Sequence, residues 1–260
     1  MDLGVNIDHI AVLREARMVN NPNFIDALSI CERAGAKQIT IHLREDRRHI
    51  QDKDVADVLE HSVLPVNLEC AIEPSIIDIV CNLLPHRATL VPEKREEVTT
   101  EGGLAISTDN TRLTNAIEKL HDNEIEVSLF IDPTIEAVET SKELGVEWIE
   151  LHTGRYSNLY AMLYSNLPHS KHAVEELRLS RKELKEQLAK ELEQLKEVSI
   201  LAKELGLKVA AGHGLNYQNV KDIVEIEQIE ELNIGQSIVA RSIFSGLYKA
   251  IIDMKGLVNG

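Results

Sequence analysis

The chain has 260 residues, 43% of them hydrophobic, and a formal net charge of −15 at pH 7. This acidity and the aromatic content of only 3% argue against a nucleic-acid partner, which would need basic patches and stacking platforms. No stretch reaches the ~20 apolar residues of a membrane span, and the N-terminal M-D-L-G-V-N-I-D lacks the features of a signal peptide. Cys31, Cys70 and Cys81 show no metal or redox spacing, which predicts a cytoplasmic protein in a reducing compartment.

Strands and helices are predicted to alternate along the whole chain. The predicted strands are 3–7, 38–42, 66–69, 88–91, 127–131, 148–151, 207–211 and 232–234. The predicted helices are 24–34, 52–61, 74–84, 112–122, 134–144, a long region that Gly206 ends, 220–224 and 238–257. Asp52 is a plausible N-cap for the second helix, and Pro74 takes the favoured first-turn position of the third.

This alternation is typical of a parallel sheet, and the length matches one (β/α)8 barrel. We therefore expect an α/β fold, a TIM barrel in which residues 1–260 form a single domain. The main alternative is an open, doubly wound sheet. No G-x-G-x-x-G follows the first strand, which weakens the dinucleotide-binding version of that alternative.

The strands carry a second pattern, because polar residues share one parity and apolar residues the other. Parallel strands are normally apolar on both faces. The polar parity here contains Asn6, Thr40, His42, Asn67, Glu69, Ser128, Glu150, His152 and Asn233. Burying an unpartnered polar group costs about 2–7 kcal/mol, so the pattern predicts a shared polar interior on the barrel axis. That interior is either a structural hydrogen-bond network or a ligand site.

The segment from Tyr156 to Leu205 is too long for one strand-to-helix connection, and we expect an extended helical insertion after the sixth strand. Lys and Glu separate its apolar residues, as in an amphipathic helix. The helix either packs its stripe on its own barrel or forms a subunit contact or helical hairpin. The stripe contains Leu184, Leu188, Leu192, Leu195 and Val198.

Two sequence features predict a phosphorylated ligand. The glycine turns A-G-H-G-L and N-I-G-Q-S follow strands seven and eight, the usual phosphate-binding loops of such barrels. Glycine lets backbone N–H groups approach an anion, and a following helix N-terminus favours negative charge. The first two loops also concentrate arginines, which clamp phosphate well. Some of these could instead pair with Glu45 and Asp46. They are Arg14, Arg17, Arg44, Arg47 and Arg48.

Acid–base chemistry at neutral pH needs histidine, or a carboxylate whose pKa burial has raised. The candidates at strand ends are His42, Glu69, Glu150, His152 and His213. The same side chains could bind a metal, but no H-x-H or H-E-x-x-H spacing supports this. A Schiff-base lysine is not expected, because Lys208 lies at the opening end of its strand.

Several long strings, in order and nearly end to end, resemble the pyridoxine 5′-phosphate synthase family. They are G-V-N-I-D-H-I at 4–10, T-I-H-L-R-E-D-R-R-H-I at 40–50, N-L-E at 67–69, L-V-P-E-K-R-E-E-V-T-T-E-G-G at 90–103, S-L-F-I-D at 128–132, E-L-H-T-G at 150–154, A-G-H-G-L at 211–215 and L-N-I-G at 232–235. The resemblance implies a (β/α)8 barrel that condenses 3-amino-2-oxopropyl phosphate with 1-deoxy-D-xylulose 5-phosphate. Pyridoxine 5′-phosphate forms, and phosphate and water are released. No metal or redox cofactor is implied, and the assembly is a homo-oligomer, an octamer by resemblance.

The resemblance also implies roles for individual residues. His42 and Glu69 match proton acceptors, His213 a proton donor, and Glu150 a position that stabilises a transition state. Contacts to the amino ketone phosphate are implied for Asn6 and Arg17, and backbone contacts to phosphate for Gly214 and Gly235. Contacts to the deoxyxylulose phosphate are implied for Asp8, His9, Arg44, His49 and Thr99.

Two features depart from the family pattern. Gln236 stands where histidine is expected, which would preserve a backbone contact and remove an imidazole contact. The insertion is also longer and more charged than expected. The loop 92–103 is predicted to close over substrate. Two other functions remain open from the residues, a phosphosugar isomerase or aldolase on the same barrel and a non-catalytic regulator that binds a phosphometabolite.

Overall fold

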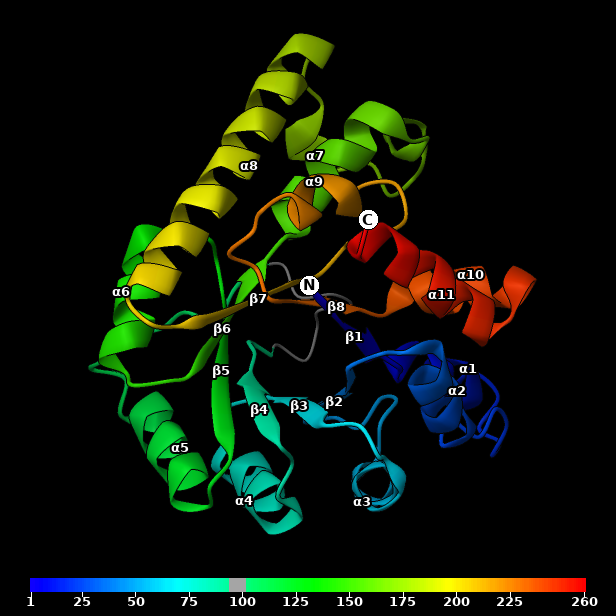
Figure 1. The fold of residues 1–260 in the computed structure, drawn as a ribbon, viewed down its shortest axis with the longest axis vertical. Helices are drawn as coiled ribbons and strands as arrows, with labels where there is room; N and C mark the ends of the chain where they lie inside the picture. The colour runs from blue at the N-terminus through cyan, green and yellow to red at the C-terminus, as the bar shows by residue number, and fades with distance from the viewer. Residues whose placement is uncertain (94–101) are drawn as a thin grey trace.

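The computed structural model describes residues 1–93 and 102–260. Eight parallel strands pair in chain order, and β1 pairs with β8 to close the barrel (Figure 1). The strands are β1 (Asp2–Asn6), β2 (Gln38–Leu43), β3 (Val66–Cys70), β4 (Arg87–Leu90), β5 (Glu126–Ile131), β6 (Trp148–His152), β7 (Lys208–Gly212) and β8 (Glu231–Ile234). The predicted TIM barrel is confirmed, and the open sheet was the wrong alternative.

Helices surround the strands on the outside of the barrel (Figure 1). They are α1 (Asp8–Glu15), α2 (Asp26–Ala34), α3 (Asp52–His61), α4 (Pro74–Leu83), α5 (Thr111–Asp122), α6 (Ile135–Glu143), α7 (Gly154–Tyr164), α8 (Arg181–Glu204), α9 (Val220–Val224), α10 (Gln236–Ser245) and α11 (Leu247–Val258). Two short 3-10 helices, η1 (Leu167–His169) and η2 (Glu175–Leu177), lie between α7 and α8.

Three local predictions were wrong. Helix α1 was not predicted, because it buries only Asp8 and Ala11 and so has a weak apolar stripe. The last predicted helix is two helices, since Gly246 adopts a φ of 78° that ends α10. The N-cap of α3 is Gln51 and not Asp52, and the Gln51 backbone N–H donates to the Asp54 carboxylate at 2.9 Å. Asp52 is the first residue inside the helix and pairs with Arg47.

The long segment after β6 contains most of α7, both 3-10 helices and α8. Helix α8 stands along one side of the barrel (Figure 1) and packs against α6, α7 and β7. Its capping box joins Ser180 and Glu183, which explains where it begins. The predicted apolar stripe therefore packs on the chain's own barrel, through buried Leu184, Leu188, Leu195 and Val198 and half-buried Leu192.

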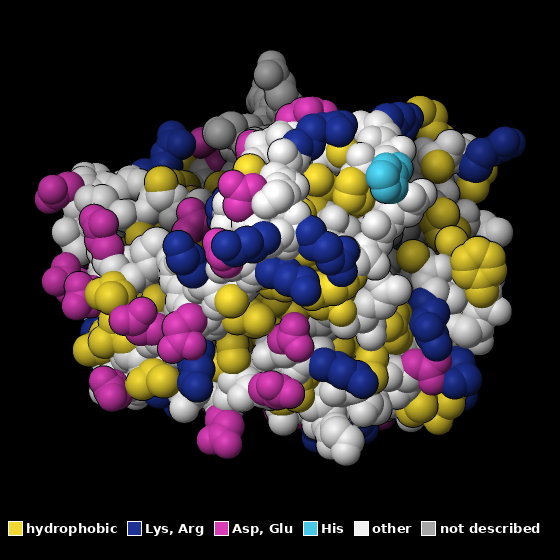
Figure 2. All heavy atoms as spheres, turned by 90° about the horizontal axis from the view of Figure 1, so that it is seen from above, with side chains coloured by type: hydrophobic (Ala, Val, Ile, Leu, Met, Phe, Trp, Pro, Cys, Tyr) yellow, Lys and Arg dark blue, Asp and Glu magenta, His cyan; other side chains and the backbone are white. Residues whose placement is uncertain are grey.

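Charges of both signs share the surface with apolar side chains. Figure 2 shows the face seen from above Figure 1, where basic side chains gather near the middle and acidic ones mainly on the left. Within the described ranges, no helix has the length and apolar character to cross a membrane.

The two parities of the strands face different surroundings, as predicted. The apolar parity packs against the helices, and Val5, Ile39 and Leu151 are fully buried. The polar parity lines the barrel axis and pairs within itself. Thr40 Oγ1 donates to Asn233 Oδ1 at 3.0 Å, and Thr89 Oγ1 donates to Asn67 Oδ1 at 2.8 Å. Much of the polar interior is thus a structural hydrogen-bond network.

An ion pair anchors the amino-terminal end of this interior. Arg87 on β4 and Glu231 on β8 pair at 2.9 Å (Nη1 to Oε1), and both side chains are buried. Gln38 Nε2 donates to the same Glu231 oxygen at 3.0 Å. The Arg87 guanidinium lies 3.7 Å from the centre of the Trp148 ring, a cation–π contact. Neither charge is therefore left without a partner.

Replacing Arg87 should cost far more stability than replacing a surface arginine. Arg87→Leu leaves the Glu231 carboxylate buried without its cation, and we expect a loss of about 3–5 kcal/mol. Arg112→Leu removes an exposed ion pair with Glu73 and should cost about 1 kcal/mol or less. Urea unfolding of both variants measures the difference, and equal losses would show that the buried pair is not a main anchor.

Candidate active site

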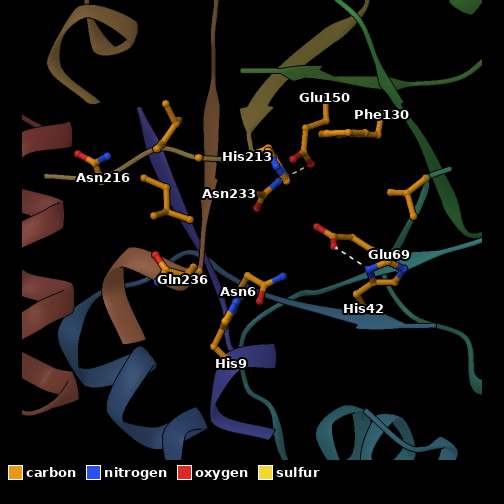
Figure 3. A pocket seen from close by; sticks show the side chains of 15 residues that line it. Asn6, His9, His42, Glu69, Phe130, Glu150, His213, Asn216, Asn233 and Gln236 are labelled. Carbon is orange, nitrogen blue, oxygen red and sulfur yellow. Dashed lines mark hydrogen bonds and ion pairs between the residues drawn. The ribbon is translucent and has the colours of Figure 1, made fainter. Parts of the chain in front are cut away.

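A cavity of about 330 Å³ opens at the carboxyl-terminal ends of the strands (Figure 3). Its wall takes side chains from β1, β2, β3, β5, β6 and β8, from the start of α1, and from the loops after β4, β7 and β8. Most of the predicted site residues meet there: Asn6, His9, His42, Glu69, Glu150, His213, Gly214, Gly235 and Gln236. The wall also contains Val91, Phe130, Leu215, Asn216, Asn233 and Ile234, which were not predicted as site residues.

His42 lies between two carboxylates. Its Nε2 is 2.7 Å from Glu93 Oε1, and its Nδ1 is 3.8 Å from Glu69 Oε2. Register explains the second contact, because His42 and Glu69 are direct neighbours on β2 and β3. Asp8 Oδ1 accepts the backbone N–H of His42 at 2.9 Å, which fixes the strand end. The hydrogen bond to Glu93 thus orients the imidazole, and the Glu69 carboxyl group lies on its other side.

Glu93 is a site residue that the sequence reasoning missed. Burial acts to raise the pKa of Glu93, but the hydrogen bond and charge of His42, the backbone N–H of Glu45 and the charge of Arg44 lower it overall. The Glu45 N–H to Glu93 Oε2 distance is 2.9 Å. The position of Glu93, three residues after β4 in a barrel whose sites lie at strand ends, was the available signal.

Two carboxylates in the cavity have raised pKa values. Burial, then the charges of Glu150 and Asp8, raises the pKa of Glu69 well above its usual range, although 17% of its side chain is exposed to the cavity. Burial also raises the pKa of Glu150 to about 7, while a hydrogen bond from Asn233 opposes that rise. A carboxyl group with a pKa near 7, as Glu150 has, can take up and release protons near neutral pH.

His213 occupies a strained turn between two glycines. Its φ of 80° is unusual for a residue with a side chain, at a cost of about 1–3 kcal/mol. Thr153 holds the turn, as its hydroxyl lies 2.6 Å from the Gly212 carbonyl and 2.7 Å from the His213 carbonyl. Burial, with a smaller effect of His152, lowers the pKa of His213 to about 4. The imidazole is therefore neutral at pH 7.

His152 supports His213 from outside the cavity. Their ring centres lie 5.0 Å apart. His152 Nδ1 is 3.3 Å from Asp132 Oδ1, and this hydrogen bond lowers the pKa of Asp132 against the effect of burial. His152 and Asp132 line a second, larger hollow of about 800 Å³ bounded by α7 and α8. His152, one of the acid–base candidates, is thus a neighbour of the site and not part of the cavity wall.

The predicted arginine cluster is mostly paired. Arg14 binds Asp54 through two bonds of 2.9 and 2.6 Å, and Arg48 pairs with Asp46 at 2.7 Å. Arg17 is exposed beyond the end of α1 and does not line the cavity. Arg44 is buried, and its charge acts on both Glu93 and His49. Of the five arginines, Arg44 is the one that the fold buries beside the acid–base groups.

The remaining predicted contacts gather near His42. The ring of His49 lies 6.3 Å from that of His42, and burial lowers the pKa of His49 against the charge of Asp8. Burial likewise lowers the pKa of His9, again opposed by Asp8. Thr99 lies outside the described residues, as does most of the loop 92–103.

The glycine turns lie on the other side of the cavity from His42 and Glu69 (Figure 3). Gly235 is the N-cap of α10, so the first N–H groups of that helix begin at the cavity wall. A Cβ on Gly235 would lie only 2.9 Å from Cβ and Oδ1 of Asn6. Gly235 therefore has no room for a side chain, and the N–H groups of the first helical turn, which have no partner within the helix, favour an anion there. Among the described residues, no group of three or more His, Cys, Asp or Glu is arranged to hold a metal ion.

A closed parallel barrel with paired acid–base groups at its carboxyl-terminal strand ends defines an enzyme of the TIM-barrel class. A family model described as "Pyridoxal phosphate biosynthesis protein PdxJ" matches residues 3–260, and the chain belongs to this family. Two curated relatives are named "Pyridoxine 5′-phosphate synthase". One from Sulfurovum sp. is 66% identical over 258 residues, covering 99% of this chain and 100% of the relative. One from Aliarcobacter butzleri is 67% identical, covering 99% of each.

Similar solved structures support the fold alone, because their sequence identity is low. Monomers of phosphoribosylanthranilate isomerase from Thermotoga maritima give a TM-score of 0.58 at 10% identity, covering 100% of this chain and 99% of that one. Tryptophan synthase from M. tuberculosis gives 0.60 at 10% identity, covering 98% and 92%.

We expect the imidazole of His213 to stay neutral throughout the neutral pH range. Its pKa of about 4 lies below the ordinary 6.5, so protonating the native state is unfavourable, and stability should fall as pH drops from 6.5 toward 4. Nitrogen NMR of histidine-labelled protein measures the titration, and the spectrum of His213→Gln identifies the signal. A midpoint at or above the ordinary value would contradict the burial argument.

Proposed function

We propose that the protein is a pyridoxine 5′-phosphate synthase. It condenses 3-amino-2-oxopropyl phosphate with 1-deoxy-D-xylulose 5-phosphate, and releases phosphate and water as the ring forms. The observation that carries the proposal is the near-full-length identity of 66–67% to relatives of that name. The cavity supports it, because amine–ketone condensation, loss of water and ring closure need proton transfers in both directions.

The acid–base roles divide across the cavity. His42 and Glu69 act as proton acceptors, Glu69 from its ionised form, which is a strong base because burial disfavours it. The Glu93 carboxylate keeps the His42 ring oriented. His213 acts as proton donor from a neutral ring, so one ring nitrogen gives up its N–H proton as the other takes up a proton from substrate or water, and the ring stays neutral. Glu150 stabilises positive charge that develops on the condensing nitrogen. The imine forms between the two substrates and not on a lysine.

The two phosphates bind at opposite sides. Asn6 and the backbone N–H groups of Gly214, Gly235 and Gln236 bind the amino ketone phosphate from the cavity wall. Arg17 lies outside that wall and joins them when its side chain turns toward the bound phosphate. Helix α10 contributes a favourable N-terminal dipole at this side. The deoxyxylulose phosphate binds on the side of His42, through Asp8, His9, Arg44 and His49, with Thr99 completing the set.

We further propose a cytoplasmic homo-oligomer. Cys31, Cys70 and Cys81 are all buried and free, in keeping with a reducing compartment. Exposed apolar side chains on α10 and α11 offer a subunit contact, above all Phe244, which is 93% exposed. In this proposal the residues 1–260 are one domain, with 156–205 as a helical insertion in it. Sedimentation of the pure protein as a monomer would contradict the oligomer.

Glu69→Gln should abolish most turnover and preserve substrate binding. The amide cannot accept a proton, and losing a general base typically costs about 10²–10⁴-fold in kcat. Both substrates would be mixed with the parent or variant, and phosphate release and product absorbance followed. Glu118→Gln, at an exposed position of α5, is the matched control and should match the parent. Binding of both substrates without any product from the parent would instead indicate a phosphometabolite-binding regulator.

The glycine turn and Gln236 should respond differently to substitution. Gln236→Ala keeps the backbone N–H, so we expect KM for the amino ketone phosphate to change by about threefold or less. Gly235→Ala pushes a Cβ against Asn6 and should raise that KM by about tenfold or more. Steady-state kinetics distinguishes the two. A larger effect from Gln236→Ala would mean that its side chain binds substrate.

A further inference from the structure

Asn233 on β8 lies opposite a glycine on both neighbouring strands. Gly4 on β1 and Gly212 on β7 are each its direct register partner. A Cβ on Gly4 would collide with the Asn233 amide oxygen, and a Cβ on Gly212 would collide with Oε1 of Glu150. The two glycines therefore open a slot on the inner barrel wall, and the Asn233 amide and the Glu150 carboxyl group fill it.

The four hydrogen bonds of the Asn233 side chain fix its orientation. Oδ1 accepts from Thr40 Oγ1 at 3.0 Å and from Gln38 Nε2 at 3.4 Å. Nδ2 donates to Glu150 Oε2 at 2.8 Å and to Glu231 Oε1 at 3.3 Å. Rotating the amide by half a turn would point its oxygen at two carboxyl groups. The donor therefore faces Glu150, as the dashed line in Figure 3 marks.

We propose that Asn233 is a positioning residue of the active site, which holds the Glu150 carboxyl group in the cavity wall and stabilises its ionised form. The inference rests on the proposed function, in which Glu150 acts as a carboxylate. Its amide is neutral, so it stabilises the charge without adding a countercharge that would hold Glu150 permanently ionised.

Among the groups around Glu150, Asn233 does most to stabilise its ionised form. The charged or titratable groups that face it are Glu69 from β3, Arg87 from β4, Glu231 from β8 and, in the same cavity, His213. Glu231 and Arg87 act on Glu150 in opposite directions and are paired with each other at 2.9 Å. The Asn233 hydrogen bond is the strongest influence that offsets burial at Glu150.

The test is a pH–rate profile of Asn233→Ala beside the parent. Without the donor the carboxylate is harder to form, so the acidic limb of kcat should move up by about one pH unit, with kcat at pH 7 lower by about fivefold. KM should change little. Asn67→Ala is the matched control, because it removes another buried interior amide that bonds Thr89 and does not touch Glu150. Its acidic limb should stay in place.

A second variant covers the case in which Asn233→Ala does not fold. Thr40→Val keeps the shape of the side chain and removes one bond that orients the amide, so the limb should move in the same direction by less. An infrared titration of the Glu150 carboxyl group, identified with Glu150→Gln, reports the ionisation without turnover. An inactive parent would overturn the proposed function, while this titration would still decide the role of Asn233. An unmoved titration in both variants would overturn the inference.

Discussion

The structure depends on how carboxyl groups are accommodated on a barrel axis from which water is largely excluded. Burying an ionised carboxylate without partners is far more costly than burying a neutral polar group. Glu231 escapes this cost through Arg87 and Gln38. Glu69 and Glu150 avoid it differently. Burial raises their pKa values, so that they can take the neutral, protonated form. One interior thus contains a permanently paired carboxylate and two that can change charge.

This difference follows the strand direction. At the amino-terminal end the polar residues satisfy one another, and the network serves stability. Toward the carboxyl-terminal end the same parity reaches the cavity, where part of the hydrogen-bonding capacity faces a ligand. Asn233 belongs to both regions, because it bonds Glu231 below and Glu150 above. A substitution in the network around Glu231 can therefore alter the ionisation of Glu150 through the Asn233 amide alone, without any movement of the strands.

The sequence predicted the barrel well because its signals are local. Alternating strands and helices identify the fold, and the polar parity of strands such as 38–42 identifies the axis. Features that depend on register were not predictable in this way. Arg14 meets Asp54 forty residues away, so its counter-ion is not visible in its own loop. Glu93 reaches His42 only because β4 ends beside the same cavity, and the slot around Asn233 exists only once β1, β7 and β8 are aligned.

The site separates its proton-transfer groups by environment. Burial raises the pKa values of Glu69 and Glu150 and lowers that of His213, so all three groups move toward their uncharged forms. A cavity built in this way can hold two phosphorylated substrates without adding many fixed negative charges of its own. It also places a neutral imidazole opposite a carboxyl group, that of Glu150, whose pKa of about 7 lets it donate or accept a proton near neutral pH. Condensation with loss of water requires donors and acceptors in one space, and desolvation, opposed at Glu150 by the Asn233 hydrogen bond, supplies both kinds from ordinary Glu and His side chains.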